Sequence, residues 1–403
     1  MRIERVDCDV LLAPHCDIDS CDTSQDNAVV RVWGEDGHVG IGEVESNPWV
    51  IRSLIDSPSS NAYSRSLGEL LVGEDAADPR RVWDNLYRRS ILVGRRGAGI
   101  CAIGALDMAV WDLCGKASAA PVWKLLDGGA AQDSVVPYAS LLPAGRNLAE
   151  YRADLLAKVE WALRSGFRAA KLEILIRGPF AQYGMHESND AIVEIVGTAR
   201  AIVGPAFDLM VDVGYCWEDW REAAAVLERC ERYEPYFIET PLQPDDLGAY
   251  ARLAGMTEIP VAAGELLQTR FEFEDLMDRG HVDIVQPDIG RVGGITEAFR
   301  VSRLAEERGK RVVPHCWRSA IGIAASAQIA AVSANCPYIE YLPAGVAESA
   351  LRRELVANEP ALERGVMAIP EAPGLGVTLN ARAFERFKAA ALRTETASNL
   401  APG

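Results

Sequence analysis

Residues 208–213 read Asp-Leu-Met-Val-Asp-Val, and segments of the same kind return at 236–240, Tyr-Phe-Ile-Glu-Thr, and at 260–265, Pro-Val-Ala-Ala-Gly-Glu. Each segment is a short apolar run of strand length that closes on a carboxylate, in order Asp212, Glu239 and Glu265. The chain between them has room for one amphipathic helix each time. Strands that alternate with helices predict βα units and a parallel sheet.

The same alternation continues on both sides, over a region that we predict to be the catalytic domain, residues 128–357. Its eight candidate strands are Val135–Ser140, Arg168–Leu175, Asp208–Val213, Tyr236–Thr240, Pro260–Glu265, Val282–Pro287, Arg311–His315 and Tyr338–Tyr341. A plausible helix follows every strand except the last. The pattern therefore predicts an α/β fold, a (β/α)-barrel of the TIM type in a modified (β/α)7β-like form, with its active site at the C-terminal ends of the strands.

The first 127 residues mix strands and helices, as an α+β domain would. Residues 27–34 and 38–45 flank Glu35-Asp-Gly37, a tight hairpin turn, and helical periodicity is strongest over Ile103–Cys114. After Ala357 come turns rich in Pro and Gly and a helix near Ala381–Leu392.

Charge and composition limit the classes of molecule that the protein can bind and where it can be located. The net charge of −17 disfavours nucleic acid and an anionic membrane surface. The start of the chain shows no signal peptide, and the apolar helical stretch Ile321–Ala334 is shorter than the ~18 residues that a membrane span needs. The nine cysteines are expected to be reduced thiols. We expect a soluble, cytoplasmic protein.

Carboxylates on consecutive strand ends converge on one point of a barrel rim. Asp212, Glu239 and Glu265 would repel one another strongly there, so a cation is expected among them. All-oxygen ligation fits Mg²⁺, with Mn²⁺ as the alternative, better than zinc.

The remaining strand ends supply acid–base groups. Asp288 follows strand six and His315 ends strand seven, and a histidine beside a carboxylate is a general base whose tautomer the carboxylate sets. On strand two, Lys171 and Glu173 point to the same face, toward the barrel interior. Lys171 is placed to bind a substrate carboxylate. A divalent cation and Lys171 would stabilise an enediolate while His315 takes the α-proton.

Several motifs in combination resemble the enolase superfamily, and within it the mandelate racemase/muconate lactonizing enzyme family, in its mandelate racemase-like branch. They are Ala105-Leu-Asp-Met-Ala-Val-Trp-Asp-Leu-Cys-Gly-Lys116, Gly166-Phe-Arg-Ala-Ala-Lys171, Phe237-Ile-Glu-Thr-Pro-Leu242, Ala263-Gly-Glu265, Gln286-Pro-Asp288, Val313-Pro-His315 and Pro373-Gly-Leu-Gly376. The resemblance covers nearly the whole chain.

This resemblance implies a capping domain built from residues 1–127 with residues 358–403 returning to it. It also implies Mg²⁺ on Asp212, Glu239 and Glu265, an Asp288–His315 dyad, and Glu340 as a hydrogen-bond donor to the substrate carboxylate. We expect a homo-oligomer that acts on a small carboxylate. Two positions depart from the branch: Lys171-Leu-Glu173 replaces the usual Lys-x-Lys, and Asp212-Val-Gly214 lacks an Asn found in many relatives.

Members of the branch most often dehydrate acid sugars. We therefore predict a lyase that converts an aldonate or aldarate to a 2-keto-3-deoxy acid, with Glu173 binding a substrate hydroxyl. The alternatives are a racemase, epimerase or cycloisomerase of a carboxylic acid, and a barrel that binds acid sugars without turnover. A hydrolytic metal barrel would want His-x-His on strand one, which reads Val135-Val-Pro-Tyr-Ala-Ser140.

Specificity is expected to come from the cap and the barrel rim, because functional loops vary most. The candidate lid segments are His15–Asp26 and Asn47–Arg52. The candidate substrate contacts from the barrel are Tyr138, Trp317 and Arg318.

Overall fold

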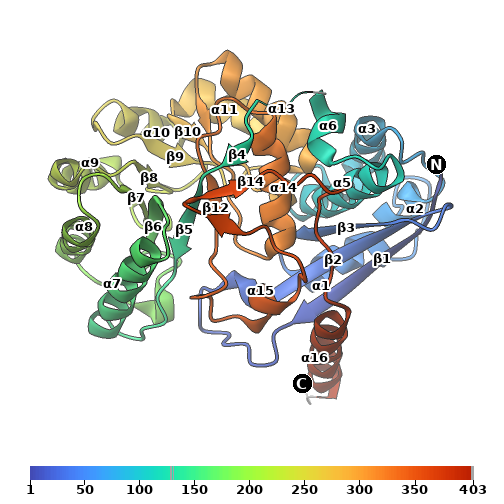
Figure 1. Ribbon diagram of the computed structural model, residues 1–403, viewed down its shortest axis with the longest axis horizontal. Helices are drawn as coiled ribbons and strands as arrows, with labels where there is room; N and C mark the ends of the chain where they lie inside the picture. Colours follow the sequence, from blue (N-terminus) through green and yellow to red (C-terminus); the bar gives the residue numbers. More distant parts are fainter. Residues whose placement is uncertain (128, 130, 401–403) are drawn as a thin grey trace.

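The centre of the molecule is a sheet of eight parallel strands in the order β11-β10-β9-β8-β7-β6-β5-β12 (Figure 1). The structure is a computed structural model that describes residues 1–127, 129 and 131–400. The strands are β5 (Pro137–Leu141), β6 (Ala169–Glu173), β7 (Asp208–Asp212), β8 (Phe237–Glu239), β9 (Val261–Ala263), β10 (Ile284–Val285), β11 (Arg311–Val312) and β12 (Ile339–Tyr341). All eight lie within or overlap the predicted segments, so that prediction is confirmed.

The sheet curls until its two ends meet. β12 pairs with β5, and the backbone N–H of Glu340 donates to the carbonyl of Pro314, just after β11, at 3.3 Å. Helices follow the first seven strands: α7 (Leu148–Arg164), α8 (Asn189–Val203), α9 (Trp220–Cys230), α10 (Leu247–Ala254), α11 (Thr269–Gly280), α13 (Ile295–Glu307) and α14 (Ala320–Ala331), with the short α12 (Ile289–Val292) before α13. The helix that comes next after β12, α15 (Ala350–Glu354), has only five residues. The fold is the (β/α)7β form of the barrel.

A layer of apolar side chains fills the barrel beneath the strand ends. Its fully buried members are Tyr138, Ala169, Met210, Phe237, Ala262, Ile284 and Val313. Side chains in a strand alternate between faces, so the residue two positions further along points into the same interior, one layer higher. In this upper layer stand Ser140, Lys171, Asp212, Glu239, Gln286 and His315. The polar layer of the site thus lies directly above the apolar layer, two residues further along each strand.

The cap contains the antiparallel strands β1 (Ile3–Leu12), β2 (Asp26–Gly34) and β3 (Val39–Val44), and β2 and β3 form the predicted hairpin. The twenty-residue helix α5 (Ala98–Ala117) lies on this sheet. Contact is close because β3 presents glycine: a Cβ at Gly40 would stand 1.9 Å from the carbonyl oxygen of Ala109. α5 is long and apolar enough to cross a membrane, but 94% of its most apolar window is buried inside the protein, as in a core helix.

Shorter helices complete the cap: α1 (Pro48–Asp56), α2 (Leu67–Leu71), α3 (Pro79–Arg89), α4 (Ile91–Gly94) and α6 (Val122–Asp127). The C-terminal part of the chain contacts both regions. β13 (Leu362–Glu363) and β14 (Val366–Ala368) join β4 (Ser134–Val135) in a small antiparallel sheet. The helix α16 (Ala381–Leu400) packs beside β1, where Lys388 Nζ lies 2.6 Å from Asp9 Oδ1 (Figure 1). Of the predicted domain boundaries, residue 128 and residues 401–403 lie outside the described residues.

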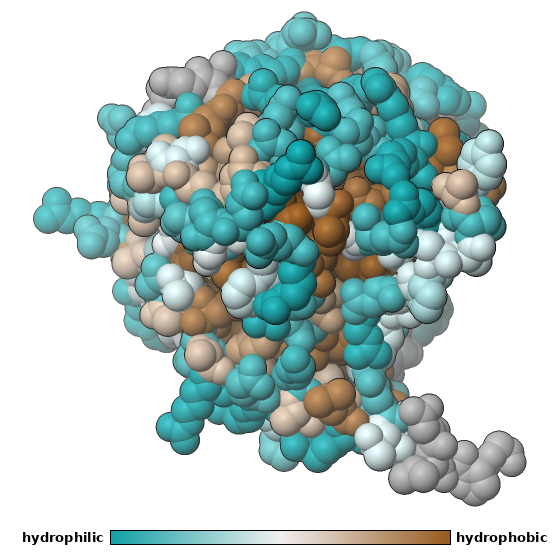
Figure 2. Space-filling model, turned by 90° about the vertical axis from the view of Figure 1, so that its right-hand side faces the viewer, coloured by the Kyte–Doolittle hydropathy of each residue, from teal (hydrophilic) through white to brown (hydrophobic). Residues whose placement is uncertain are grey.

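Hydrophilic side chains cover most of the face shown in Figure 2, and hydrophobic ones lie between and beneath them. The nine cysteines are all free thiols, as expected from the sequence.

Candidate active site

Three carboxylates meet where β7, β8 and β9 end. Asp212 and Glu239 are the last residues of their strands and Glu265 follows β9 by two, and one oxygen from each lies within 4.8 Å of the others. Neighbouring donors hold two of these carboxylates in place: the hydroxyl of Thr240 donates to Asp212 Oδ1 at 2.6 Å and the amide of Gln286 to Glu239 Oε2 at 2.6 Å. An all-oxygen set held in this way suits a hard divalent cation.

Lys171, at the centre of β6, is the cation nearest to this trio. Its Nζ lies 2.7 Å from Glu239 Oε1, 2.8 Å from Glu340 Oε1, 3.4 Å from Glu173 Oε1 and 3.7 Å from Asp212 Oδ2. The side chain is 1% exposed, so these interactions are not screened by water. The carboxylates around Lys171 therefore carry more negative charge than one ammonium can balance.

The unbalanced charge changes the pKa of each group. Burial raises the pKa of Glu239 to about 8 against the attraction of Lys171. Burial likewise raises the pKa of Glu265. Burial also opposes ionisation of Asp212, but Lys171 and hydrogen bonds from Glu173, Thr240 and the Gly214 N–H outweigh it and lower its pKa. A bound divalent cation would supply the missing positive charge and keep all three ligands ionised.

His315 and Asp288 form a close pair beside the trio. Nδ1 of His315 lies 2.8 Å from Asp288 Oδ2, and the other oxygen of Asp288 accepts the backbone N–H of Arg291 at 2.9 Å. A proton on Nδ1 held by Asp288 leaves Nε2 turned toward Glu265, at 3.4 Å. Burial lowers the pKa of His315, but Glu340, Glu265 and Asp288 together raise it well above the usual range.

Glu340, at the middle of β12, is tied to Glu173 by a shared partner. Ser140 Oγ lies 2.6 Å from Glu340 Oε1 and 2.7 Å from Glu173 Oε1. A hydroxyl has one proton, so both hydrogen bonds form together only if one of the carboxyl groups is protonated. Burial raises the pKa of Glu173 well above its usual range against the attraction of Lys171, and Asp212 and Glu340 add to the rise.

The constellation matches a known family over most of the chain. A family model described as "Enolase C-terminal domain-like" matches residues 154–383, and one described as "Mandelate racemase / muconate lactonizing enzyme, N-terminal domain" matches residues 8–127. The chain belongs to the mandelate racemase/muconate lactonizing enzyme family of the enolase superfamily.

Relatives within the family include both lyases and isomerases. The chain is 29% identical to the arabinonate dehydratase of Saccharolobus solfataricus over 88% of each chain. It is 30% identical to the D-galactarolactone cycloisomerase of Agrobacterium fabrum, over 90% of this chain and 91% of the relative. A solved racemase of Streptomyces coelicolor with bound magnesium is 27% identical and superposes with a TM-score of 0.80, over 96% of this chain and 99% of that one.

As in other barrels of this type, the site opens at the C-terminal ends of the strands. An inner pocket of about 140 Å³ lies there, lined from the barrel by Lys171, Glu173, Asp212, Glu265 and His315. The cap supplies Cys21, Thr23 and Glu45. Both parts of the molecule thus build the site.

The cap loop, residues 15–26, crosses the barrel mouth as expected of a lid. The backbone N–H of Cys21 donates to Gln182 Oε1 at 2.8 Å, and the indole N–H of Trp317 donates to Asp22 Oδ1 at 3.3 Å. Trp317, predicted as a substrate contact, lines the inner pocket. The second predicted lid, Asn47–Arg52, is instead the start of α1, and Arg52 pairs with Glu395 of α16 at 2.8 Å. That lid prediction is wrong, because the segment packs within the cap.

Two residues that we predicted to contact the substrate, Tyr138 and Arg318, lie elsewhere in the structure. Tyr138 is fully buried in the apolar layer below Ser140, and its hydroxyl has no hydrogen-bond partner among the described residues. It lies one layer too deep to touch a substrate. Arg318 donates to the carboxylate of Asp26 and to the backbone carbonyls of Thr23, Asp26 and Ser46. Its guanidinium therefore fastens the cap to the barrel.

Three residues of the site, Ser140, Glu45 and Arg291, were not predicted from the sequence. Ser140 shares the inward face of β5 with Tyr138, and strand phase alone would have found it. Glu45 follows β3 and reaches the inner pocket from the cap, where its Oε1 lies 3.0 Å from Nη2 of Arg291. Burial opposes ionisation of Glu45, but Arg291 and His315 lower its pKa to about 2. No local pattern placed Glu45 or Arg291, because their meeting depends on how the cap sits on the barrel.

Proposed function

We propose that this protein is a magnesium-dependent dehydratase of acid sugars, which converts an aldonate or aldarate to a 2-keto-3-deoxy acid. The observation that carries the proposal is the asymmetry of the site. On one side His315 and Asp288 form an acid–base pair; on the other, where a second base would stand, is Glu173, hydrogen-bonded to Ser140 and 3.4 Å from Lys171. One working base favours elimination over inversion.

Asp212, Glu239 and Glu265 would hold Mg²⁺, which when bound offsets the charge that develops on the substrate carboxylate as the α-proton leaves. Lys171, close to Glu340 and facing the same pocket, binds that carboxylate as well. Preorganised cationic groups at the site of developing charge are the main source of catalysis in such a reaction.

A cation on Glu265 would offset one of the carboxylates that raise the pKa of His315. The neutral imidazole takes the proton from C2 of the substrate through Nε2, while Asp288 holds it in the required tautomer. The C3–O bond then breaks, and the imidazolium returns the proton to the departing hydroxyl, which leaves as water. The enol that remains tautomerises to the 2-keto-3-deoxy acid. Both proton transfers use one group, so hydrogen and hydroxyl leave from the same face. Glu173 binds a substrate hydroxyl.

The experiment is a screen of aldonic and aldaric acids with Mg²⁺, scored for 2-keto-3-deoxy products, with substrate recovered from D₂O before completion. We expect product formation and no inversion at C2. Recovery of the C2 epimer carrying deuterium would overturn the one-base mechanism. A screen with no product and no exchange at C2 would favour a protein that binds acid sugars without turnover.

A cycloisomerase is the second candidate, supported by the similarity to the A. fabrum enzyme. Its reaction would also begin at the carbon next to a carboxylate, but an acid-sugar lactone would be consumed without loss of water. Mass analysis of the product separates the two, because only dehydration changes the elemental composition.

A further inference from the structure

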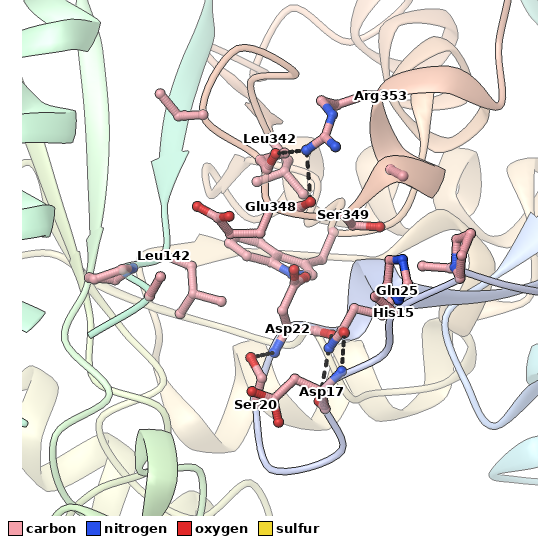
Figure 3. Close-up of a pocket in the computed structure, with 18 of the residues that line it drawn as sticks. His15, Asp17, Ser20, Asp22, Gln25, Leu142, Leu342, Glu348, Ser349 and Arg353 are labelled. Carbon is pink, nitrogen blue, oxygen red and sulfur yellow. Dashed lines mark hydrogen bonds between the residues drawn. The ribbon is translucent and has the colours of Figure 1, made fainter. Parts of the chain in front are cut away.

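A second and larger cavity adjoins the inner pocket. This outer chamber has a volume of about 580 Å³, within the range of about 300–1,000 Å³ usual for organic ligands. One wall is the cap loop, with Ser20 and Asp22, and the opposite wall is the segment after β12, with Glu348 and Arg353 (Figure 3). Nothing in the chemistry described above uses this space.

Two side chains, Leu142 and Trp317, line both cavities. Ser140 also lines the outer chamber, although its hydroxyl bonds to Glu173 and Glu340 at the centre of the site. The two cavities are therefore adjacent, with Leu142 and Trp317 at their common border.

The cap loop forms the partition between the cavities. Cys21 and Thr23 line the inner pocket, whereas Ser20 and Asp22 line the outer chamber. The indole of Trp317 extends the partition from the barrel side and is held by Asp22 at 3.3 Å. An indole beside the carboxylate of Asp22 and the hydroxyl of Ser20 offers an apolar surface and hydrogen-bond partners together, which suits a ring that carries hydroxyl groups.

Charges in the chamber are largely paired with each other. Asp17 lies 2.8 Å from Arg146, and Arg386 lies 2.6 Å from Glu354. One nitrogen of Arg353 donates to the backbone carbonyls of Ala347 and Glu348. Glu348 lies 3.8 Å from Nζ of Lys158, and Asp22 accepts from the indole of Trp317. Since these charged groups already have partners within the protein, the lining favours an uncharged ligand over a second carboxylate or a phosphate.

We propose that the outer chamber binds an uncharged, hydroxyl-rich substituent, such as a glycosyl group, at the end of the substrate away from its carboxylate. This rests on the proposed dehydratase function. Elimination consumes the hydrogen at C2 and the hydroxyl at C3, so the substituent is attached at C4 or beyond. The preferred substrate is then a glycosylated aldonate rather than a simple one.

The experiment compares kcat/KM for lactobionate, cellobionate and maltobionate with that for galactonate and gluconate. Two additional hydrogen bonds in the chamber would favour the best glycosylated substrate by about tenfold or more. Glucarate, which carries a second carboxylate at C6 and no glycosyl group, tests the charge argument and should show no such gain. The readout is 2-keto-3-deoxy product in each case.

A variant whose new side chain fills the outer chamber tests whether the preference for glycosylated aldonates arises there. Val346 is half-buried and lines only the outer chamber, so Val346→Trp should lower kcat/KM for the glycosylated aldonate by about tenfold and leave that for the simple aldonate unchanged. Val72→Trp, at an exposed position of the cap, is the matched control and should change neither. Ala144→Trp is a second filling variant if Val346→Trp does not fold.

The outcomes separate this inference from the function on which it rests. Turnover of simple aldonates without preference for glycosylated ones, or an equal loss on both substrates in Val346→Trp, overturns the chamber proposal and leaves the dehydratase intact. Absence of turnover and of C2 exchange with every compound overturns the dehydratase. A preference that Val346→Trp abolishes supports both.

Discussion

Replacing Glu239 by Gln should separate metal binding from folding. The oxygens of the carboxylate trio lie within 4.8 Å, a distance at which two unit charges repel by about 3 kcal/mol at an effective dielectric constant of about 20. Because burial raises the pKa of Glu239 to about 8, a neutral side chain is tolerated at this position. Without metal, Glu239→Gln is therefore expected to be at least as stable as the wild type.

With Mg²⁺ present, the wild type should become more stable than Glu239→Gln. A cation present at about 100 times its dissociation constant stabilises the folded wild type by about 2.7 kcal/mol. For a chain of 403 residues this corresponds to a rise of about 3 °C in the melting temperature. Glu239→Gln lacks one of three ligands and should rise by less than about 1 °C at the same Mg²⁺ concentration.

Thermal melts with EDTA and with a Mg²⁺ series measure both effects. Asp107→Asn is the matched control, since Asp107 is also a buried carboxylate but accepts from Thr296 at the contact of α5 with α13, so its variant should keep the full response to Mg²⁺. An equal response to Mg²⁺ in Glu239→Gln and the wild type would refute the metal assignment.

Three further variants test other groups. His315→Asn should lower kcat by about 10³-fold or more while the Mg²⁺-dependent rise in melting temperature persists, and Asp288→Asn should retain more activity; near-normal turnover in His315→Asn would exclude it as the base. Glu173→Gln should raise KM by about tenfold with little change in kcat, as loss of one hydrogen bond to the substrate would; a collapse of kcat alone would instead make Glu173 a proton carrier. Arg318→Ala should cost about 3–5 kcal/mol in urea unfolding, because it leaves the Asp26 carboxylate without its partner, and a cost below about 1 kcal/mol would contradict its role as the fastener between cap and barrel.

The barrel was predictable because its signal repeats. Each βα unit presents an apolar strand and then a polar residue at the strand end, so one phase assignment places Asp212, Glu239 and His315 together. The same phase was misapplied on β5, where Tyr138 was chosen although Ser140, two residues later, stands in the layer of the site. The predicted residue therefore points to the correct face of the strand but lies two positions too early along it.

Residues whose roles depend on the docking of cap and barrel could not be found in this way. Glu45 and Arg291 are far apart in the sequence and belong to different parts of the fold, yet their side chains meet at 3.0 Å. Arg318 was predicted to be a substrate contact from the barrel, and nothing in the sequence indicates that Asp26 and Thr23 lie next to its guanidinium. Long-range pairs of this kind have no periodicity to reveal them.

The alternation of the cap loop has a consequence for how such a site can change. Ser20 and Asp22 face one cavity while Cys21 and Thr23 face the other, so deletion of a single residue ahead of them would exchange the two sets. Polar groups that grip one end of a substrate would then be offered to the other end. A change in the length of this loop therefore alters the lining of both cavities at once. Libraries that substitute residues 20–23 at constant loop length should yield altered substrate preference more often than libraries that change the length.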